Sequence, residues 1–559
     1  MPLKGANART GVAPGSPAGW DVRHLFDSRA FPFVFALLYA ASFVWIFLIP
    51  TAFWDDLSFR NAVDRIGYGY QSGRPLLGYW WAGLAALPAY DHIAHLFVFV
   101  AYAAAALAIR CFLAELKILD ERERNAIVLL LAVLPVFQSR FLVASTYYTL
   151  DYLLFCLGAW LVARGLFRGE IWARIAGNIC LLLCFFTDSF VVLAGFLMLL
   201  LWVAWVLRAD NAPLDIGTWF AGAVSVTRRL PDLVLLPFVY FFGVKSLFPV
   251  SGAFQNYNVV TAEGVKDALL HLPFRALVAV FAINADGPSW QAMVGVSAAM
   301  AVLLLLLRWY PAAAMSDSKR TVRFYGFAVI VGFCGVMLSI FPYNAIYRYV
   351  QPYDFGDANQ LTLALSAPAF IGFLIWFLCR DWLKWTAICV AMVWSVAHNI
   401  TTYADVIMDG HIQNGLVRAL RESGEVASHH AFVVDISRYP HLSRQRKYGT
   451  AQLNCLMKEA FGDETRFAVA FTQFPFPWDR ERAMLQRFID TGTCYHQYTD
   501  EPPVLLTVYP GRGNIDQITS LKMAVMRIKN YAIYQQSLEG LISLNVAPLP
   551  PGSIQSASP

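Results

Sequence analysis

Two adjacent carboxylates, Asp55 and Asp56, open the polar segment that follows the first long apolar run of the chain. Neighbouring carboxylates repel each other, and a membrane boundary desolvates them in part. Both effects raise the pKa of a carboxyl group and make it a better general base. The alternative is structural, because an Asp before a helix is a good N-cap and residues 57–66 have an amphipathic pattern. Taken alone, the pair leaves both interpretations open.

The same segment continues with SGRPLLGYWW, in which turn-forming residues flank Arg74. They hold Arg74 just before a short apolar stretch, 76–88, which contains Trp80 and Trp81 and which we expect to lie along the membrane interface. A guanidinium at this place can bind phosphate through two hydrogen bonds. Equally, an arginine here can reach up to lipid headgroups without any specific ligand.

Further ionisable residues fall at the same end of the apolar runs. Asp151 lies inside an apolar run and Asp188 in a tight turn, while Arg140, Lys245 and Arg348 lie at run ends. Ionisable residues in apolar segments are costly and usually face a cavity or pair with one another. An Arg140–Asp151 ion pair is the structural alternative, but it does not explain why these residues gather on one side.

The elements that must position these residues are membrane helices. The 559 residues are 58% hydrophobic and 14% charged, against about 25% charged in an ordinary soluble chain. Several apolar runs reach the roughly 20 residues that cross a bilayer core. We expect an all-α polytopic membrane protein with about eleven spans, at 31–50, 95–113, 125–138, 148–167, 171–186, 190–207, 231–248, 290–307, 324–341, 361–379 and 385–400.

Alternate loops are short and basic, which fixes the expected orientation. They carry Lys117, Arg122 and Arg124; Arg164, Arg168 and Arg174; Arg208, Arg228 and Arg229; Arg308, Lys319, Arg320 and Arg323; and Arg380 and Lys384. The positive-inside rule makes these loops cytoplasmic. In a bacterial inner membrane, residues 1–30 then form a cytoplasmic tail, residues 31–402 the membrane domain, and residues 51–91 the first periplasmic loop. The sequence has no basic patch of the kind that would indicate nucleic-acid binding.

The C-terminal part has ordinary polarity and alternating patterns. Strand patterns at 431–437, 466–474 and 503–510, with helical patterns at 450–461, 480–489 and 516–533, predict a small periplasmic α/β domain over 403–547. The Pro- and Ser-rich end, 548–559, is typical of disorder. Cys455 and Cys494 are the two cysteines of this part and could form a disulfide in the periplasm.

The loop 51–91 resembles the first periplasmic loop of the GT-C superfamily of integral-membrane glycosyltransferases, most of all the bacterial O-antigen glucosyltransferases of the Gtr type. Those enzymes have an acidic pair, a following arginine and a GRPL stretch. Here the segments read DDLSFR, ending at Arg60, and SGRPLLG. The spacing from the acidic pair to Arg60 is one residue longer than the DDxxR pattern.

The resemblance implies a sugar donor attached to a polyprenyl phosphate and a surface glycan or lipid as acceptor. It assigns Asp55 as the base that takes the proton of the acceptor hydroxyl, with inversion at the anomeric carbon. Cations would stabilise the phosphate leaving group, and Arg74, Arg140, Lys245 and Arg348 are the candidates. The remaining pocket candidates are Arg60, Asp151, Asp188, Trp80 and Trp81, with the two tryptophans lining a groove for membrane lipid or the donor tail. Some relatives use Mg²⁺ or Mn²⁺, for which Asp55, Asp56 and Asp188 are candidate ligands.

Two other functions remain open. A transporter or flippase for a lipid-linked glycan is the first alternative, although such proteins place charges near the bilayer midplane and often have two matching halves. A non-catalytic membrane scaffold that presents the C-terminal domain is the second. Neither accounts for charges gathered near one surface as directly as a transferase does.

Overall fold

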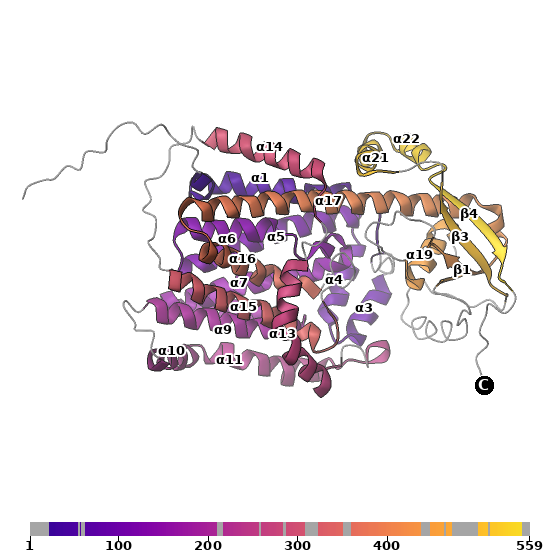
Figure 1. The fold of residues 1–559 in the computed structure, drawn as a ribbon. Coiled ribbons are helices and arrows are strands. Elements are labelled where there is room, and N and C mark those ends of the chain that lie inside the picture. The colour runs from indigo at the N-terminus through magenta and orange to yellow at the C-terminus, as the bar shows by residue number, and fades with distance from the viewer. Residues whose placement is uncertain are drawn as a thin grey trace, which may run out of the picture.

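A computed structural model describes residues 22–53, 56, 62–208, 216–255, 259–282, 287–307, 322–349, 359–437, 448–462, 465–471, 501–511 and 515–550. Within them the protein is a large helical bundle that continues into a small mixed α/β part at one end (Figure 1). Each of the eleven apolar stretches predicted from the sequence is helical. The chain is therefore a multi-pass membrane protein, as its composition predicts.

The bundle is built from helices that run roughly parallel (Figure 1). Their bounds are α1 Phe31–Phe43, α5 Tyr90–Leu116, α6 Glu121–Val133, α7 Thr146–Arg168, α8 Ile171–Cys184, α9 Ser189–Arg208, α10 Ile216–Arg229, α11 Pro231–Phe238, α12 Lys245–Leu247, α14 Trp290–Leu307, α15 Val322–Asn344, α16 Leu363–Leu378 and α17 Asp381–Glu422. Short helical turns complete it: η1 Val22–Phe26, η2 Val44–Leu48, η3 Gln138–Phe141, η4 Val143–Ser145, η5 Val239–Val244 and η6 Gly252–Phe254.

In the described part of the chain, seven helices are long and apolar enough to cross a membrane: Phe31–Leu48, Tyr90–Leu116, Val143–Arg168, Ser189–Arg208, Trp290–Leu307, Val322–Asn344 and Asp381–Glu422. An eighth candidate is the pair Gly217–Arg229 and Pro231–Leu247, which meet at a 72° bend. The other predicted spans, in α6, α8 and α16, have 13, 14 and 16 residues. At a rise of about 1.5 Å per residue they fall short of a hydrocarbon core of roughly 30 Å.

The predicted basic loops meet at one end of the bundle. Arg168 donates to the Glu115 carboxylate over 2.9 Å, and Arg208 donates to the carbonyl of Leu116 over 3.0 Å. At the same end, Arg122 pairs with Asp27 at 2.7 Å. These contacts join the ends of α5, α7 and α9 to the start of α6, as expected for loops on one side of a membrane.

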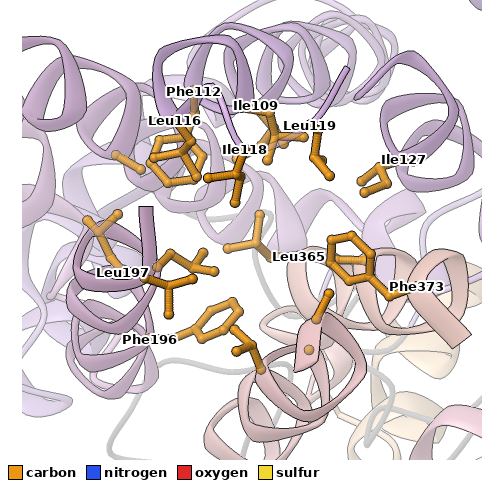
Figure 2. Close-up of a pocket in the computed structure, with 18 of the residues that line it drawn as sticks. Ile109, Phe112, Leu116, Ile118, Leu119, Ile127, Phe196, Leu197, Leu365 and Phe373 are labelled. Atoms are coloured by element: carbon orange, nitrogen blue, oxygen red, sulfur yellow. The ribbon is translucent and has the colours of Figure 1, made fainter. Parts of the chain in front are cut away.

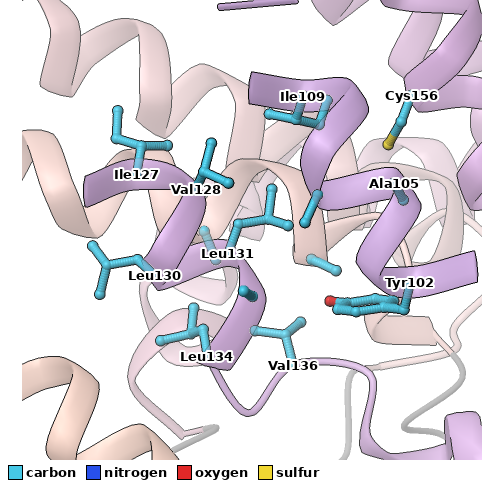
Figure 3. Close-up of a cluster of buried hydrophobic side chains, with 14 of the residues drawn as sticks. Tyr102, Ala105, Ile109, Ile127, Val128, Leu130, Leu131, Leu134, Val136 and Cys156 are labelled. Carbon is cyan, nitrogen blue, oxygen red and sulfur yellow. The ribbon is translucent and has the colours of Figure 1, made fainter. Parts of the chain in front are cut away.

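Apolar side chains from several helices fill the middle of the bundle. Figure 3 shows Ile109 of α5 and Ile127 and Leu131 of α6 in one cluster of buried side chains, together with Tyr102 and Cys156. Beside this cluster lies an apolar cavity, lined by residues such as Phe112, Phe196, Leu197, Leu365 and Phe373 (Figure 2). The cavity lies between α5, α9, α15 and α16, so the bundle is not packed solid.

The helix α17 carries the membrane part directly into the C-terminal part. Its 42 residues span about 63 Å, roughly twice a hydrocarbon core. The boundary predicted at residue 402 falls inside this helix, because a drop in hydropathy ends an apolar run without ending a helix. Ile412 and Leu416 of α17 share a core with Phe432 and Leu506 of the sheet.

The sheet has four strands in the order β2-β1-β3-β4: β1 Ala431–Asp435, β2 Phe467–Ala470, β3 Val504–Pro510 and β4 Ile542–Pro548. The pairs β1–β2 and β1–β3 are parallel, with Val433 opposite Val469 and Leu505, and β3–β4 is antiparallel. Four helices accompany it: α18 Gly424–Ala427, α19 Thr450–Phe461, α21 Gln517–Lys529 and α22 Tyr531–Ser537. The three predicted strands are confirmed, β4 was not predicted, and the predicted helix at 480–489 lies outside the described residues.

Three more helices stand at the end of the bundle nearer the sheet, opposite α10 (Figure 1): α3 Ala62–Gln71, α4 Pro75–Ala85 and α13 Ala262–Ala282. The helix α4 matches the stretch expected to lie at the interface. The helix α13 falls in the outer loop 249–289, which was not predicted to be helical. The first loop and the C-terminal part thus lie at the same end of the molecule.

Candidate functional site

The close packing of α3 against α4 fixes the position of the turn that carries Arg74. A Cβ added at Gly78 would lie 2.6 Å from the carbonyl oxygen of Arg65, so only glycine allows this approach. Gly73 has φ +70°, and a Cβ there would lie 2.9 Å from the carbonyl oxygen of Phe248. The tight turn that the sequence predicts at 72–75 therefore exists, and it presents the side chain of Arg74 toward the turn between α8 and α9.

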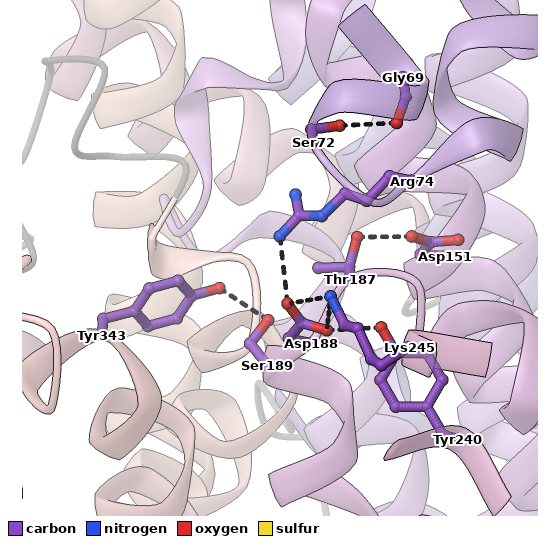
Figure 4. A network of polar contacts seen from close by, with 10 residues as sticks. All are labelled: Gly69, Ser72, Arg74, Asp151, Thr187, Asp188, Ser189, Tyr240, Lys245 and Tyr343. Atoms are coloured by element: carbon purple, nitrogen blue, oxygen red, sulfur yellow. Dashed lines mark hydrogen bonds and ion pairs between the residues drawn. The ribbon is translucent and has the colours of Figure 1, made fainter. Parts of the chain in front are cut away.

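Arg74 there joins a group that we call the Asp188 cluster, made of Arg74, Asp188, Tyr240 and Lys245 (Figure 4). The Asp188 carboxylate lies 3.6 Å from Nη2 of Arg74 and 3.0 Å from Nζ of Lys245. It also accepts a hydrogen bond of 2.5 Å from the hydroxyl of Tyr240. Three separate segments of the chain therefore meet at one carboxylate, and Arg74, Asp188 and Lys245 were candidates predicted from the sequence.

A second layer fixes the turn that carries Asp188. The hydroxyl of Thr187 donates to the carboxylate of Asp151 over 2.6 Å, and the hydroxyl of Tyr343 donates to Ser189 over 3.0 Å (Figure 4). Asp151 is fully buried. Asp151 therefore fixes the turn through Thr187, and α15 fixes it through the hydrogen bond from Tyr343 to Ser189.

The charges of the cluster leave it net positive. Two cations face one carboxylate, and the Asp188 side chain is 42% exposed, so the group is open to a ligand. Burial opposes the charge on Arg74, but attraction to Tyr148, Asp188 and Tyr240 outweighs it and raises the pKa of Arg74. A guanidinium and an ammonium at a membrane boundary are donors suited to a phosphate group, while the hydroxyl proton of Tyr240 is donated to Asp188.

Arg140 is not part of this cluster. It is 2% exposed, and its guanidinium lies 3.8 Å from the ring centre of Phe43 and 4.2 Å from that of Tyr102. It also makes no ion pair with Asp151, although both residues are described, so the structural alternative of an Arg140–Asp151 pair is wrong. Contact with aromatic faces stabilises this cation in place of an acid.

The described contacts of the Asp188 carboxylate do not include Arg348, Trp80 or Trp81, although both tryptophans pack in the same apolar cluster as Phe186 and Val244. Arg348 is exposed in the turn after α15, where its backbone N–H donates to the carbonyl of Tyr343. The indole of Trp80 donates to Thr146 over 2.9 Å and that of Trp81 to the carbonyl of Ala144 over 3.2 Å. The tryptophans thus dock α4 onto the start of α7, and neither lines the apolar cavity of Figure 2.

The predicted acidic pair is described in part. Asp55 and Arg60 lie outside the described residues. Asp56 is buried, and its two carboxylate oxygens accept hydrogen bonds from the backbone N–H groups of Val143 at 2.8 Å and Ala144 at 2.6 Å. Because Ala144 also packs against Trp81, the segment 143–148 lies between Asp56 and the Asp188 cluster.

The metal prediction can be tested only in part. Among the described residues, no three His, Cys, Asp or Glu side chains come together as metal ligands. Asp56 and Asp188 bind different partners and do not share a site. Cys455 is disulfide-bonded, while the seven cysteines of the helical bundle are free. Its predicted partner, Cys494, lies outside the described residues.

Several residues near the candidate site were missed from the sequence. Tyr240 and Tyr343 contact the Asp188 turn, and Asp91, His95 and Arg527 line a polar pocket together with Asp56. Asp91 and His95 are four residues apart at the start of an apolar helix, so they lie on one helical face, and this spacing was an available signal. Nothing in the spacing of Tyr240, Tyr343 or Arg527 points to these sites.

Comparisons with known proteins supply no family for this chain: no family model, no curated protein and no solved structure matches it.

Proposed function

We propose that this chain is a GT-C-type membrane glycosyltransferase. It transfers a sugar from a polyprenyl-phosphate carrier to a surface glycan or lipid acceptor. The reaction takes place on the periplasmic face of a bacterial inner membrane that the chain crosses about eleven times, with its N-terminus inside and its C-terminal domain outside.

The observation that carries the proposal is the Asp188 cluster. A phosphate leaving group on a lipid needs cations at the membrane surface, held in place before the reaction. Arg74 and Lys245 come from the first loop and from the end of α11–α12, and Asp188 holds both at 3.6 Å and 3.0 Å. Arg74 belongs to the same first loop of the sequence as the acidic pair, and the helices α3 and α4 beside it lie at the end of the bundle that carries the C-terminal domain.

The apolar cavity extends from the middle of α9 to Leu116 and Leu207 at the basic end of the bundle, and the part of it nearest the cluster gives further support. Its walls include Phe196 and Leu197 of α9 and Val331 of α15, and the same two helices bear Ser189 and Tyr343 at the cluster. Phe196 lies seven residues after Ser189 on α9, about 10 Å farther along the helix axis. A carrier whose phosphate lies at Arg74 and Lys245 can therefore extend its isoprenoid chain toward this cavity.

In the proposed reaction, Asp55 takes the proton of an acceptor hydroxyl. The hydroxyl oxygen forms a bond to the anomeric carbon, and the bond from that carbon to the phosphate oxygen breaks with its electron pair left on the phosphate. Attack from the face opposite the phosphate inverts the anomeric centre. Arg74 and Lys245 stabilise the charge that develops on the departing phosphate.

Replacement of the proposed base tests this function. Asp55→Asn is expected to abolish incorporation of the sugar into the surface glycan, while expression and co-purification of the carrier lipid stay near wild type. Asp267→Asn is a matched control, since Asp267 pairs with Arg275 within α13 and is not among the described partners of the Asp188 cluster. Incorporation at the wild-type rate by Asp55→Asn would reject Asp55 as the base.

A flippase behaves differently in a direct assay. Vesicles that contain the purified protein and the carrier lipid, with no acceptor glycan, would show transbilayer movement of the carrier. The transferase proposed here leaves the carrier on its own side under those conditions, and it consumes the carrier only when the acceptor is added.

A further inference from the structure

A second polar pocket lies beside Asp56, and we call it the His95 pocket. It is lined by Pro50, Asp56, Asp91, His95, Val143 and Arg527, among others. These residues come from the first loop, the start of α5, the turn η4 and the helix α21. The C-terminal domain thus contributes part of the wall of a pocket whose remaining wall belongs to the membrane domain.

His95 has a defined tautomer in this pocket. Its Nε2 lies 3.0 Å from the carbonyl oxygen of Phe141, which can only accept a hydrogen bond. Nε2 therefore carries the proton, and Nδ1 is left as a hydrogen-bond acceptor. Nδ1 is buried and has no hydrogen-bond partner among the described residues, and His95 is 6% exposed. A buried polar atom left unsatisfied is costly, so the pocket favours a ligand that brings a donor.

Arg527 contributes a donor to the same pocket. Its Nη1 donates to the carbonyl of Pro50, which ties α21 to the first loop. Burial lowers the pKa of Arg527, while attraction to Tyr534, Tyr531 and Asp91 opposes that shift. The position of Arg527 therefore depends on the docking of the C-terminal domain onto the first loop.

The charges of the pocket lining are not net positive. The lining holds two carboxylates, Asp56 and Asp91, and one guanidinium, Arg527. Arg65 does not belong to the lining, but both carboxylates attract it, and burial lowers its pKa to about 10. The imidazole of His95 is a neutral acceptor. Such a pocket offers acceptors and a donor without a net positive charge, which suits the hydroxyl groups of an uncharged sugar better than a phosphate.

We propose that the His95 pocket binds a neutral sugar residue, with His95 Nδ1 accepting a hydrogen bond from one of its hydroxyls and Arg527 closing the pocket from the C-terminal domain. The identification of this sugar as the acceptor rests on the proposed function. The binding of a sugar does not, because it requires neither the donor lipid nor Asp55.

The test uses the full chain in lipid nanodiscs and a panel of methyl hexopyranosides, observed by saturation-transfer NMR. At least one member is expected to bind. His95→Gln keeps an amide donor near Phe141 but removes the Nδ1 acceptor, and Arg527→Gln removes the guanidinium. Each is expected to weaken binding about tenfold, since one hydrogen bond at a buried partner is lost. His271→Gln and Arg275→Gln on α13 are the matched controls and are expected to bind as wild type.

Three outcomes would overturn the proposal: no panel member binds the wild-type chain, both pocket variants bind as well as the wild type, or inorganic phosphate displaces the sugar. Arg527→Gln keeps the test decisive if His95→Gln does not fold, as judged from its thermal unfolding. Sugar binding by Asp55→Asn without any transferase activity in the wild type would remove the proposed function and leave this pocket in place. If both pocket variants transferred the sugar with an unchanged KM for the acceptor, the His95 pocket would be rejected as the acceptor site and the proposed function would remain.

Discussion

Lys245→Met tests whether the Asp188 cluster binds the phosphate of a lipid carrier. The substitution keeps the length and apolar stem of the side chain and removes its charge. Asp188 loses the ammonium at 3.0 Å and keeps Arg74 at 3.6 Å and Tyr240 at 2.5 Å. One cation then faces one carboxylate, so the cluster changes from net positive to neutral.

The size of the effect follows from one lost charge-assisted hydrogen bond. Such a bond contributes about 1.5–3 kcal/mol, and about 1.4 kcal/mol corresponds to tenfold in affinity. The side chain of Lys245 is 21% exposed and that of Asp188 42%, so water screens the interaction and the lower end applies. We therefore expect the affinity for a polyprenyl phosphate to fall about tenfold.

The assay is the binding of a polyprenyl phosphate to the full chain in nanodiscs, followed by native mass spectrometry. Lys384→Met is the matched control, because Lys384 lies at the start of α17, at the basic end of the bundle, against the rings of Trp385 and Tyr325. It is expected to bind as wild type. Equal losses in both variants, or none in Lys245→Met, would refute the assignment of the cluster as a phosphate site.

Three further predictions concern the structure around the site. Asp56→Asn removes the carboxylate whose two oxygens accept hydrogen bonds from backbone N–H groups. We expect the free energy of unfolding to fall by about 2 kcal/mol, which is measured as a lower unfolding temperature. An unchanged temperature would contradict the description of Asp56 as a structural anchor. Gly73→Ala forces a side chain onto φ +70° beside the carbonyl of Phe248, and is expected to cost about 1–3 kcal/mol and to weaken carrier binding by displacing Arg74. Carrier binding at the wild-type level would show that the turn does not position Arg74. Peptide mapping without reduction is expected to recover Cys455 linked to Cys494, and a Cys455 peptide linked to any other cysteine would contradict this pairing.

The sequence predicted the helices of the membrane domain well, because a long apolar run has few other ways to satisfy its backbone in a membrane. It did not predict where those helices end. The helix α17 continues some twenty residues beyond its apolar part, since residues 401–422 contain no proline and pack against α21 and the sheet. The strand β4 was missed because its sequence runs into a Pro-rich end, whereas its pairing with β3 decides its conformation.

The candidate site could likewise be predicted from the sequence only in part. The turn at Arg74 could be predicted from local residue types, and the one-sided charge pattern pointed to Asp188 and Lys245 as its neighbours. The place of Arg140 could not be predicted, because Phe43 and Tyr102 lie on different helices and no spacing along the chain brings them to it. The His95 pocket was not predicted for the same reason, because Arg527, which lines it, comes from the far end of the sequence.

The central claim is that the chain moves a sugar from a lipid phosphate onto an acceptor, and the glycan composition of the cell surface tests it most directly. Cells that lack the protein are compared with cells that carry the wild type and with cells that carry Asp55→Asn. We expect one sugar substituent to be present only with the wild-type protein, and the carrier-linked form of that sugar to accumulate in the other two. Identical surface glycans in all three strains would contradict the account.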